Sequence, residues 1–444
     1  MSARPVVGSD HVAITPPRVA ATQMWQRVWA LWISWSLIAA LSIMYVSPQL
    51  LPLAIVGLTA ALSIYITRSW RPGPHWGRMS AVTLPVLSLS AILLATHDPG
   101  VSVGLVLIGT GVAWVGLLVG RWERRWQLGI VMIAATLVLI AGWHWGHASI
   151  DVFTVMQGGG SALLHGANPY FQRFASTTSG VPFYYYPYGP IALGLSLPFA
   201  GLGDVRILSL LAAIAILGTA FTRSASDLDS TQRVSLLLLS PWLVWSVLQS
   251  WNELPISALL LWWFILRCRQ VPLTWPLVGL ALGISPVAII PLVPIGILYP
   301  ELRRDILLGC GLAAGLYSWT LIAVGLPQGL AIWHLLSGAR YGITWSIGGF
   351  YQLVVGTGPP LWVVAVCETA VLGLGYLNAG RLQVHRRLWV GVLMLLIVLC
   401  SPASYFEYMI FPAIWIWWYL ASASLEPLPA EGAELTTTID YIAP

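Results

Sequence analysis

Lysine is missing from this sequence, and charge of either sign is scarce. Only 8% of the 444 residues are charged, whereas 58% are hydrophobic and the mean hydropathy is +0.80. Soluble domains carry roughly a quarter charged residues, so this composition excludes a protein whose whole surface faces water. We therefore expect lipid to be the solvent for most of the chain.

Cysteine is also rare, and no two cysteines are close in the sequence. The four are Cys268, Cys310, Cys367 and Cys400. Because there is no CxxC pair, neither a zinc site nor a redox site is predicted, and we expect buried free thiols. Residues 1–26 lack the short apolar core and small-residue cleavage site of a signal peptide, so the first apolar run is expected to remain as an anchor.

Arginine supplies all of the strong positive charge, and its distribution indicates how the chain is oriented. The formal net charge is +5, from 21 basic and 16 acidic residues. The arginines lie in short loops between apolar runs, which argues against nucleic acid as a partner and is typical of cytoplasmic loops of a membrane protein. The pattern predicts a multi-pass protein of the plasma membrane with both termini in the cytoplasm.

Apolar runs long enough to cross a bilayer occur along most of the chain. If each crosses once, there are about fourteen spans, which predicts an all-α polytopic membrane protein. The runs cover residues 29–46, 51–66, 80–95, 101–119, 128–143, 189–199, 207–221, 234–248, 254–266, 277–298, 306–324, 361–376, 388–399 and 409–420. Prolines at 276, 286, 291 and 294 interrupt one run, and a broken helix at membrane depth must be enclosed by protein or line a cavity.

The loops divide the chain into regions with different expected surroundings. The count of crossings puts Arg303 and Arg386 inside but Arg267 and Arg269 outside, against the charge rule. A re-entrant pair between residues 189 and 298 would bring them inside, and the pattern alone leaves this open. The expected regions are a cytoplasmic polar tail (1–26), N-terminal transmembrane helices (27–143), an external loop (144–188), a transmembrane bundle (189–421) with an external loop near 327–358, and a disordered acidic tail (422–444).

The external loop 144–188 contains a single carboxylate, Asp151. If residues 151–165 are helical, Asp151, Ser161 and His165 share one face, which predicts an interfacial helix with a polar side. A lone carboxylate near a lipid interface can act as a general base, and the alternative is a helix cap. The three glycines at 158–160 are not followed by the GK[ST] of a phosphate loop, so they are interpreted as a bend.

The same loop contains histidines and a group of tyrosines. His165 and the other two histidines of the loop fit no metal-ligand spacing, so no metal site is predicted. The tyrosines either bind a sugar or a lipid phosphate, or form an aromatic belt at the membrane interface. The members of this group are Tyr185, Tyr186 and Tyr188.

Two later segments supply further candidates for substrate binding. Asn252 and Glu253 interrupt an apolar run, which indicates either a functional site within the membrane or a link that faces water. In the second external loop, His334 and Arg340, followed by Tyr341, offer groups that bind a phosphate. The alternative for Arg340 is an interfacial arginine whose head group extends to water.

The first external loop contains two distinctive motifs. Residues 151–170 begin with Asp151, continue with an apolar helix of small residues and end in LLHGANPY, and residues 186–190 read YPYGP. With these motifs the loop resembles glycosyltransferase family 87. Members of this family are polytopic enzymes of the GT-C superfamily, related to the polyprenyl-phosphate-mannose-dependent mannosyltransferases. The resemblance extends over residues 143–420 and is looser after the loop.

The resemblance implies a GT-C-like helical bundle with interfacial helices in the large external loop, and an inverting hexosyltransferase of the cell envelope. Asp151 aligns with the usual catalytic carboxylate of the family, which implies a general base. His165, Asn168 and Tyr170 lie in the motif and are implied to bind substrate. The implied donor is a polyprenyl-phosphate sugar such as mannose, the acceptor is a lipid or glycan outside the cytoplasm, and no cofactor is needed.

Two other classes of function fit the same composition. A secondary transporter or lipid flippase also uses broken helices and polar groups within the membrane. Against this class, the sequence contains no detectable internal repeat, and its most distinctive residues lie in an external loop. A non-catalytic assembly partner would tolerate loss of Asp151 but not of the glycines that pack helices.

Overall fold

The part of the chain that the computed structural model describes is helical and contains no β-strand. The described residues are 143, 151–174, 186–224, 243, 246–247, 250–324, 351, 355, 360–382, 386–400, 408 and 410–422. The all-α prediction is confirmed for these residues. The predicted tails, and all but the last residue of the predicted N-terminal helices, lie outside them.

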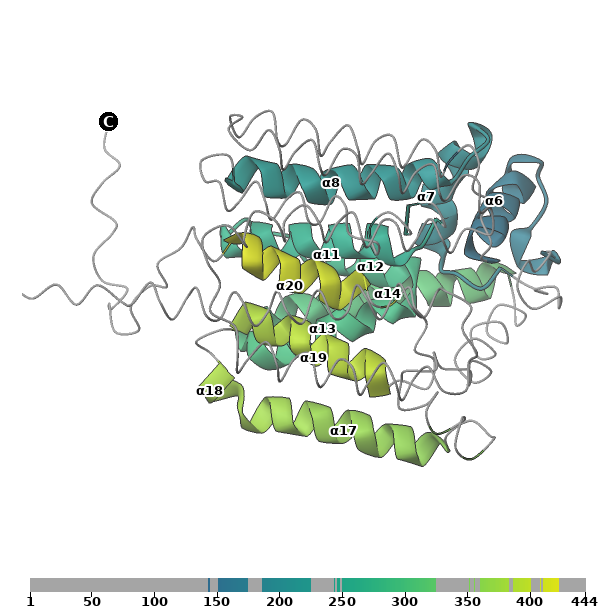
Figure 1. Cartoon of the computed structure of the whole chain (residues 1–444). Helices are drawn as coiled ribbons and strands as arrows, with labels where there is room; N and C mark the ends of the chain where they lie inside the picture. Colours follow the sequence, from purple (N-terminus) through teal and green to yellow (C-terminus); the bar gives the residue numbers. More distant parts are fainter. Residues whose placement is uncertain are drawn as a thin grey trace, which may run out of the picture.

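Most of the described helices form a bundle, with α6 at one end of it beside α7 (Figure 1). Their positions follow the apolar runs of the sequence to within a few residues, except for the run 277–298. The helices are α6 (Asp151–Leu164), α7 (Pro190–Gly201), α8 (Arg206–Ser224), α11 (Glu253–Cys268), α12 (Pro276–Ile284), α13 (Ile289–Leu298), α14 (Arg303–Val324), α17 (Leu361–Leu377), α18 (Ala379–Leu382), α19 (Arg386–Cys400) and α20 (Ile410–Ser422), with 3-10 turns η1 (Pro169–Phe171), η2 (Pro286–Ala288) and η3 (Pro300–Leu302).

The run 277–298 was expected to cross once, and it is instead a helical hairpin. The chain breaks after α12 at Ser285, because the ring of Pro286 removes a backbone N–H, and the Ser285 hydroxyl then accepts a bond from the N–H of Val287 at 3.4 Å. Before α12, the Thr274 hydroxyl donates to Asp305 at 3.3 Å. Since α13 ends at Leu298, seven residues before Asp305, both ends of the hairpin lie at the start of α14.

The hairpin reaches only part of the way along α14. The nine residues of α12 span roughly 14 Å, less than half of a bilayer core. The helix α12 runs parallel to α14. Gly279 packs on Leu312, and near the hairpin tip the Tyr317 hydroxyl donates to the carbonyl of Leu282 at 3.2 Å. The tip therefore lies beside the middle of α14.

The turn between α7 and α8 changes the chain direction by 110°. Gly203 supplies a left-handed conformation in this turn, with φ of +96°. The run 189–199 therefore does not continue into α8 as one straight helix, and α7 packs instead against α6.

Arginines gather at the end of the bundle opposite α6. Asp305 accepts a bond from the indole of Trp263 at 3.2 Å and lies 3.4 Å from Arg267 Nε. Arg386 at the start of α19 lies 3.5 Å from Glu301, just before α14. Arg267 is thus at the same end as Arg303 and Arg386. The crossing count that separated them is wrong, because the hairpin returns to the end from which it starts.

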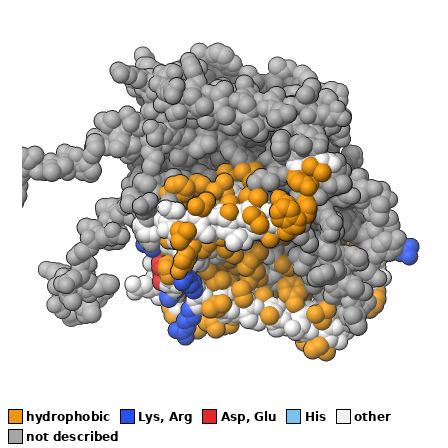
Figure 2. Space-filling model, turned by 90° about the horizontal axis from the view of Figure 1, so that it is seen from below, with side chains coloured by type: hydrophobic (Ala, Val, Ile, Leu, Met, Phe, Trp, Pro, Cys, Tyr) orange, Lys and Arg blue, Asp and Glu red, His pale blue; other side chains and the backbone are white. Residues whose placement is uncertain are grey.

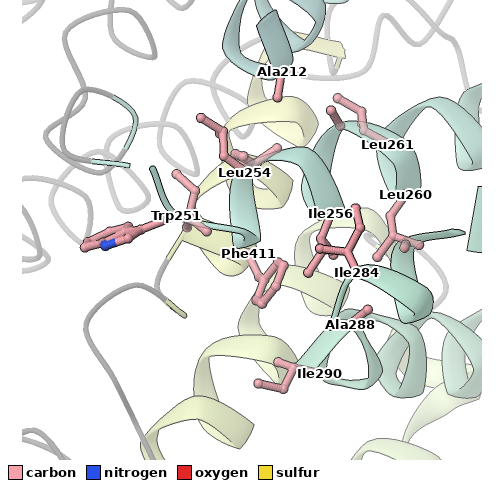
Figure 3. Close-up of a cluster of buried hydrophobic side chains, with 14 of the residues drawn as sticks. Ala212, Trp251, Leu254, Ile256, Leu260, Leu261, Ile284, Ala288, Ile290 and Phe411 are labelled. Atoms are coloured by element: carbon pink, nitrogen blue, oxygen red, sulfur yellow. The ribbon is translucent and has the colours of Figure 1, made fainter. Parts of the chain in front are cut away.

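The core of the bundle is built from apolar side chains of several helices. Figure 3 shows Ile256 of α11, Ile284 at the tip of α12 and Phe411 of α20 together, with Ala212 of α8 close to Leu254. All are buried. The N-terminal half of α11 therefore holds α8, α20 and the hairpin tip in one cluster.

The outside of the bundle is apolar to an unusual degree. Leu307 and Ile322 of α14 are 71% and 86% exposed, and Trp362 and Leu377 of α17 are exposed as well. Figure 2 shows hydrophobic side chains over one face, with most of the visible basic side chains at one end and one at the other. By length and composition, one described helix, Pro300–Ala323, can cross a membrane, and the bent α7–α8 pair adds a second if it is one span. The predicted fourteen spans are not confirmed.

The glycines of α6 generate the first prediction. A Cβ at Gly160 would lie 2.5 Å from Cβ of Ala200 in α7, whereas a Cβ at Gly194 meets no atom within 4 Å. We expect Gly160→Ala to lower the free energy of unfolding by about 1–3 kcal/mol through overpacking. The matched Gly194→Ala should raise it by about 0.5–1 kcal/mol, because alanine favours the helix.

Thermal or denaturant unfolding in detergent, followed by circular dichroism, measures both variants. Equal behaviour of the two alanines would show that α6 is not closely packed on α7.

Candidate functional site

The three adjacent glycines of α6 form a contact surface. Gly158 faces Phe174, Gly159 faces the ring of Tyr186, and Gly160 faces Ala200. The helix runs through them without interruption from Asp151 to Leu164, so the predicted bend is wrong. Glycine costs helix stability of about 1 kcal/mol per residue, and the close packing that it permits offsets this cost.

The tyrosines of the loop pack on one another beneath this helix. The Tyr186 ring is edge-on to Tyr170 at 5.6 Å, to Tyr188 at 5.7 Å and to Phe174 at 6.3 Å between ring centroids. Its hydroxyl donates to the sulfur of Met156 at 3.0 Å. Burial raises the pKa of both Tyr170 and Tyr186 far above the usual tyrosine range, so both phenols stay protonated. Tyr186 is fully enclosed, which favours a packing role for it over contact with a sugar.

Residues 186–189, called the tyrosine loop below, contact the tip of the α12–α13 hairpin directly. The backbone N–H of Gly189 donates to the carbonyl of Ile284 at 3.0 Å. A Cβ at Gly189 would collide with the carbonyl of Gly283 and with the hydroxyl of Tyr317, so only glycine permits this approach. The loop, the hairpin tip and the middle of α14 therefore form one rigid junction.

A second polar group lies at the start of α11. Asn252 is 2% exposed and Ser257 is 1% exposed, and Glu253 between them is also buried. Among the described residues, the Asn252 amide nitrogen and the Ser257 hydroxyl have no hydrogen-bond partner. The alternative of a link that faces water is wrong for this segment. Buried groups without partners cost about 1–3 kcal/mol each and require a water or a ligand to satisfy them.

The chain enters α11 through a strained residue. Ser250 has a φ of +58°, a conformation that favours glycine. Its N–H donates to Val247, and the N–H of Trp251 donates to Ser246 at 2.9 Å, which is the Schellman pattern that ends a helix. The strain accompanies a sharp change of direction just before the buried polar group.

A largely enclosed ion pair lies beside the beginning of α6. The Arg206 guanidinium binds both carboxylate oxygens of Asp204, at 2.6–3.0 Å, and lies 4.3 Å above the ring of Trp143 and 5.4 Å from that of Phe153. Trp143 and Phe153 flank Asp151 in the sequence. The arginine therefore holds both sides of the segment from which α6 starts. The sequence analysis did not identify this pair, whose signal is an acid and a base two residues apart between the apolar runs 189–199 and 207–221.

A glutamine joins α6 to the same turn. The side-chain oxygen of Gln157 accepts from the N–H of Val205 at 3.0 Å, and its nitrogen donates to the carbonyl of Ala200 at 3.4 Å. The two ends of the α7–α8 turn are thereby bound to α6.

The predicted site residues do not all meet at one place. Asp151 is the first residue of α6. His165 follows the last residue of that helix, about 20 Å away along its axis, is exposed, and has Nδ1 2.7 Å from the carbonyl of Ser161. Asn168 caps the turn η1 by accepting from the N–H of Tyr170 at 3.0 Å. Tyr185, His334, Arg340 and Tyr341 lie outside the described residues.

The cysteines and the possible metal ligands complete the inventory of reactive groups. All four cysteines are free; Cys400 is buried as expected, whereas Cys268 is exposed, against the expectation. Among the described residues, no group of three or more His, Cys, Asp or Glu side chains is placed to hold a metal ion.

No protein family, curated protein or solved structure matches the chain. The likeness to glycosyltransferase family 87 therefore rests on the residues of the loop alone. Function has to be argued from the site and from the surface around it.

The ion pair of Arg206 and Asp204 generates the second prediction. The side chains of Arg206 and Asp204 are 11% and 18% exposed, so Arg206→Gln leaves a nearly buried carboxylate without its partner and should cost about 3 kcal/mol. The matched Arg386→Gln breaks an ion pair whose side chains are 35% and 57% exposed, and should cost less than about 1 kcal/mol.

Denaturant unfolding in detergent gives the two costs, and limited proteolysis shows whether residues 144–151 become accessible in Arg206→Gln. A cost as small as that of Arg386→Gln would mean that Arg206 does not hold the start of α6.

Proposed function

We propose that the chain is a membrane glycosyltransferase of GT-C type, with Asp151 as general base. It transfers a hexose such as mannose from a polyprenyl phosphate to a lipid or glycan acceptor on the extracytoplasmic side. The observation that carries the proposal is the position of Asp151. It begins a helix that packs at the end of the bundle opposite the arginines of α11, α14 and α19, and Arg206 holds the start of this helix.

Embedding in a membrane is supported by the outer surface of the bundle. Large apolar side chains of α14 and α17 are exposed, beyond what a protein in water tolerates. The arginines at the ends of α11, α14 and α19 gather at one end, which by the charge rule faces the cytoplasm. The opposite end, with α6 and the tyrosine loop, then faces outward.

The α7–α8 turn and the α12–α13 hairpin together allow a set of membrane crossings that agrees with the charge rule. If α7 stays at the outer surface and the α12–α13 hairpin enters and leaves from the cytoplasmic side, Arg267, Arg303 and Arg386 all fall inside. The C-terminus then also falls inside after α20. Both features supply the re-entrant segments that the sequence count lacked.

The chemistry follows from these positions. The donor keeps its prenyl chain in the bilayer, and its phosphate and sugar reach the outer surface. Asp151 takes the proton of the acceptor hydroxyl, the oxygen bonds to the anomeric carbon, and the bond from that carbon to the lipid phosphate breaks with inversion. The unpartnered hydroxyl of Tyr170 and the unpartnered amide of Asn252 are the candidate donors to the leaving phosphate.

One observation favours a second function, that of a transporter or lipid flippase. The α12–α13 hairpin is broken at Ser285 and packs against α11, whose beginning carries the buried, unpartnered groups of Asn252 and Ser257. Broken helices with polar groups at membrane depth are typical of transporters. A flux assay in proteoliposomes separates this function from sugar transfer.

The third prediction tests the base. Asp151→Asn keeps the size of the side chain and removes its proton affinity, so sugar transfer from a polyprenyl-phosphate sugar in detergent should fall at least about a hundredfold. Glu123→Gln, in a loop that the sequence places on the cytoplasmic side, is the matched control and should retain its turnover.

Both proteins are compared at equal folded fraction, determined from thermal unfolding. Near-normal transfer by folded Asp151→Asn would exclude the assignment. Flux without transfer in the unmodified protein would favour the transporter.

A further inference from the structure

Two neighbouring helices begin with a pair of arginines. Arg303 and Arg304 begin α14, and Arg386 and Arg387 begin α19. The contact between Arg386 and Glu301 at 3.5 Å shows that the two helix starts are adjacent. A helix start already carries partial positive charge, so cations are disfavoured there. Their concentration at two adjacent starts needs an anion for compensation.

The carboxylates nearby do not provide enough compensation. Asp305 is occupied by Arg267, Trp263 and Thr274. Glu301 pairs with Arg386. Arg304 makes no hydrogen bond or ion pair with any residue that the structure describes.

The partner of Arg303 is a neutral group. Its Nε donates to the carbonyl of Gly296 at 2.8 Å, which leaves its charge without an anionic partner among the described residues. Both arginines at the start of α14 are exposed. Positive charge is therefore in excess at this place.

An apolar stripe continues from these arginines along α14. Leu307 and Leu308, three and four residues after Arg304, lie on the same face and are exposed. The stripe continues through Gly311 and Gly315, where an added Cβ would meet nothing within 4 Å, to the exposed Trp319 and Ile322. The middle of the stripe therefore has no side chains and forms a shallow depression between the larger side chains at its two ends.

We propose that the start of α14 binds an anionic phospholipid. Arg303 and Arg304 hold the phosphate of the headgroup, and an acyl chain lies along the stripe over Gly311 and Gly315. A free phosphate ion would not use the stripe. A second copy packed in parallel on the glycines would bring its own arginine pair beside the first, which like-charge repulsion opposes. The inference rests on the membrane embedding of the proposed function and not on its chemistry.

The fourth prediction concerns lipid binding by the purified full-length chain in detergent. Native mass spectrometry measures the dissociation constant of dioleoyl phosphatidylglycerol and of dioleoyl phosphatidylcholine. Each surface arginine contributes about 1 kcal/mol to binding of an anionic lipid, or a factor of about five. Arg303→Gln combined with Arg304→Gln should therefore weaken phosphatidylglycerol about thirty-fold, and should weaken phosphatidylcholine less, because the choline cation offsets the charge of its phosphate.

The control is Arg269→Gln, which removes an exposed arginine of the same end of the bundle at the C-terminal cap of α11, and should change the constant less than about twofold. Gly315→Trp fills the stripe, and should weaken dioleoyl but not dihexanoyl phosphatidylglycerol. Each variant is first shown to keep its thermal unfolding midpoint.

Unchanged binding in the double variant, equal affinity for both lipids, or competition by inorganic phosphate with no effect of Gly315→Trp would each overturn the proposal. A dimer that Gly315→Trp dissociates would assign the stripe to a second copy instead. Sugar transfer is a separate readout, so loss of the enzymatic proposal leaves this result interpretable.

Discussion

One buried carboxylate determines how the middle of the chain is threaded. Asp305 accepts from Trp263 and Thr274 and pairs with Arg267, all through the same oxygen. It thereby joins the end of α11, the beginning of α12 and the first turn of α14. Hydrogen bonds to a charged group contribute about 1.5–3 kcal/mol each. These bonds force α12 and α13 to enter and leave at one end, which places every described arginine of α11, α14 and α19 together.

A hairpin that ends inside the bundle must satisfy its backbone there. At its tip the carbonyl of Leu282 accepts from Tyr317, that of Ile284 accepts from the N–H of Gly189, and Ser285 caps the next turn. In lipid, each of these groups would cost several kcal/mol if left without a partner. The tip is therefore stable only where the tyrosine loop covers it. The bond from Gly189 to Ile284 also connects the tyrosine loop to the core of the bundle.

Hydrophobic run length predicted where helices are, and tertiary contacts decided how they turn. The run 361–376 became α17 almost residue for residue, because a long apolar stretch has no competing structure. The run 277–298 has the length of a single span, so its local sequence does not distinguish a span from a hairpin. The hydrogen bond between Thr274 and Asp305, which are distant in sequence, fixes the hairpin. Likewise, the packing of α11 on α12 and α20 joins segments that lie apart in sequence, and the role of Arg206 depends on rings at 143 and 153.

The contacts that hold α6 have a consequence for the proposed mechanism. A general base is effective when its position is fixed before the substrate arrives, because ordering it during the reaction would add to the barrier. Arg206 and Gln157 hold the helix from the side of α8, and the three glycines hold it against α7 and Tyr186. With α6 fixed in this way, the proposed sugar donor and acceptor would have to approach Asp151. Any change of conformation that accompanies substrate binding in such a site would then occur in the segments that face α6 and not in α6 itself.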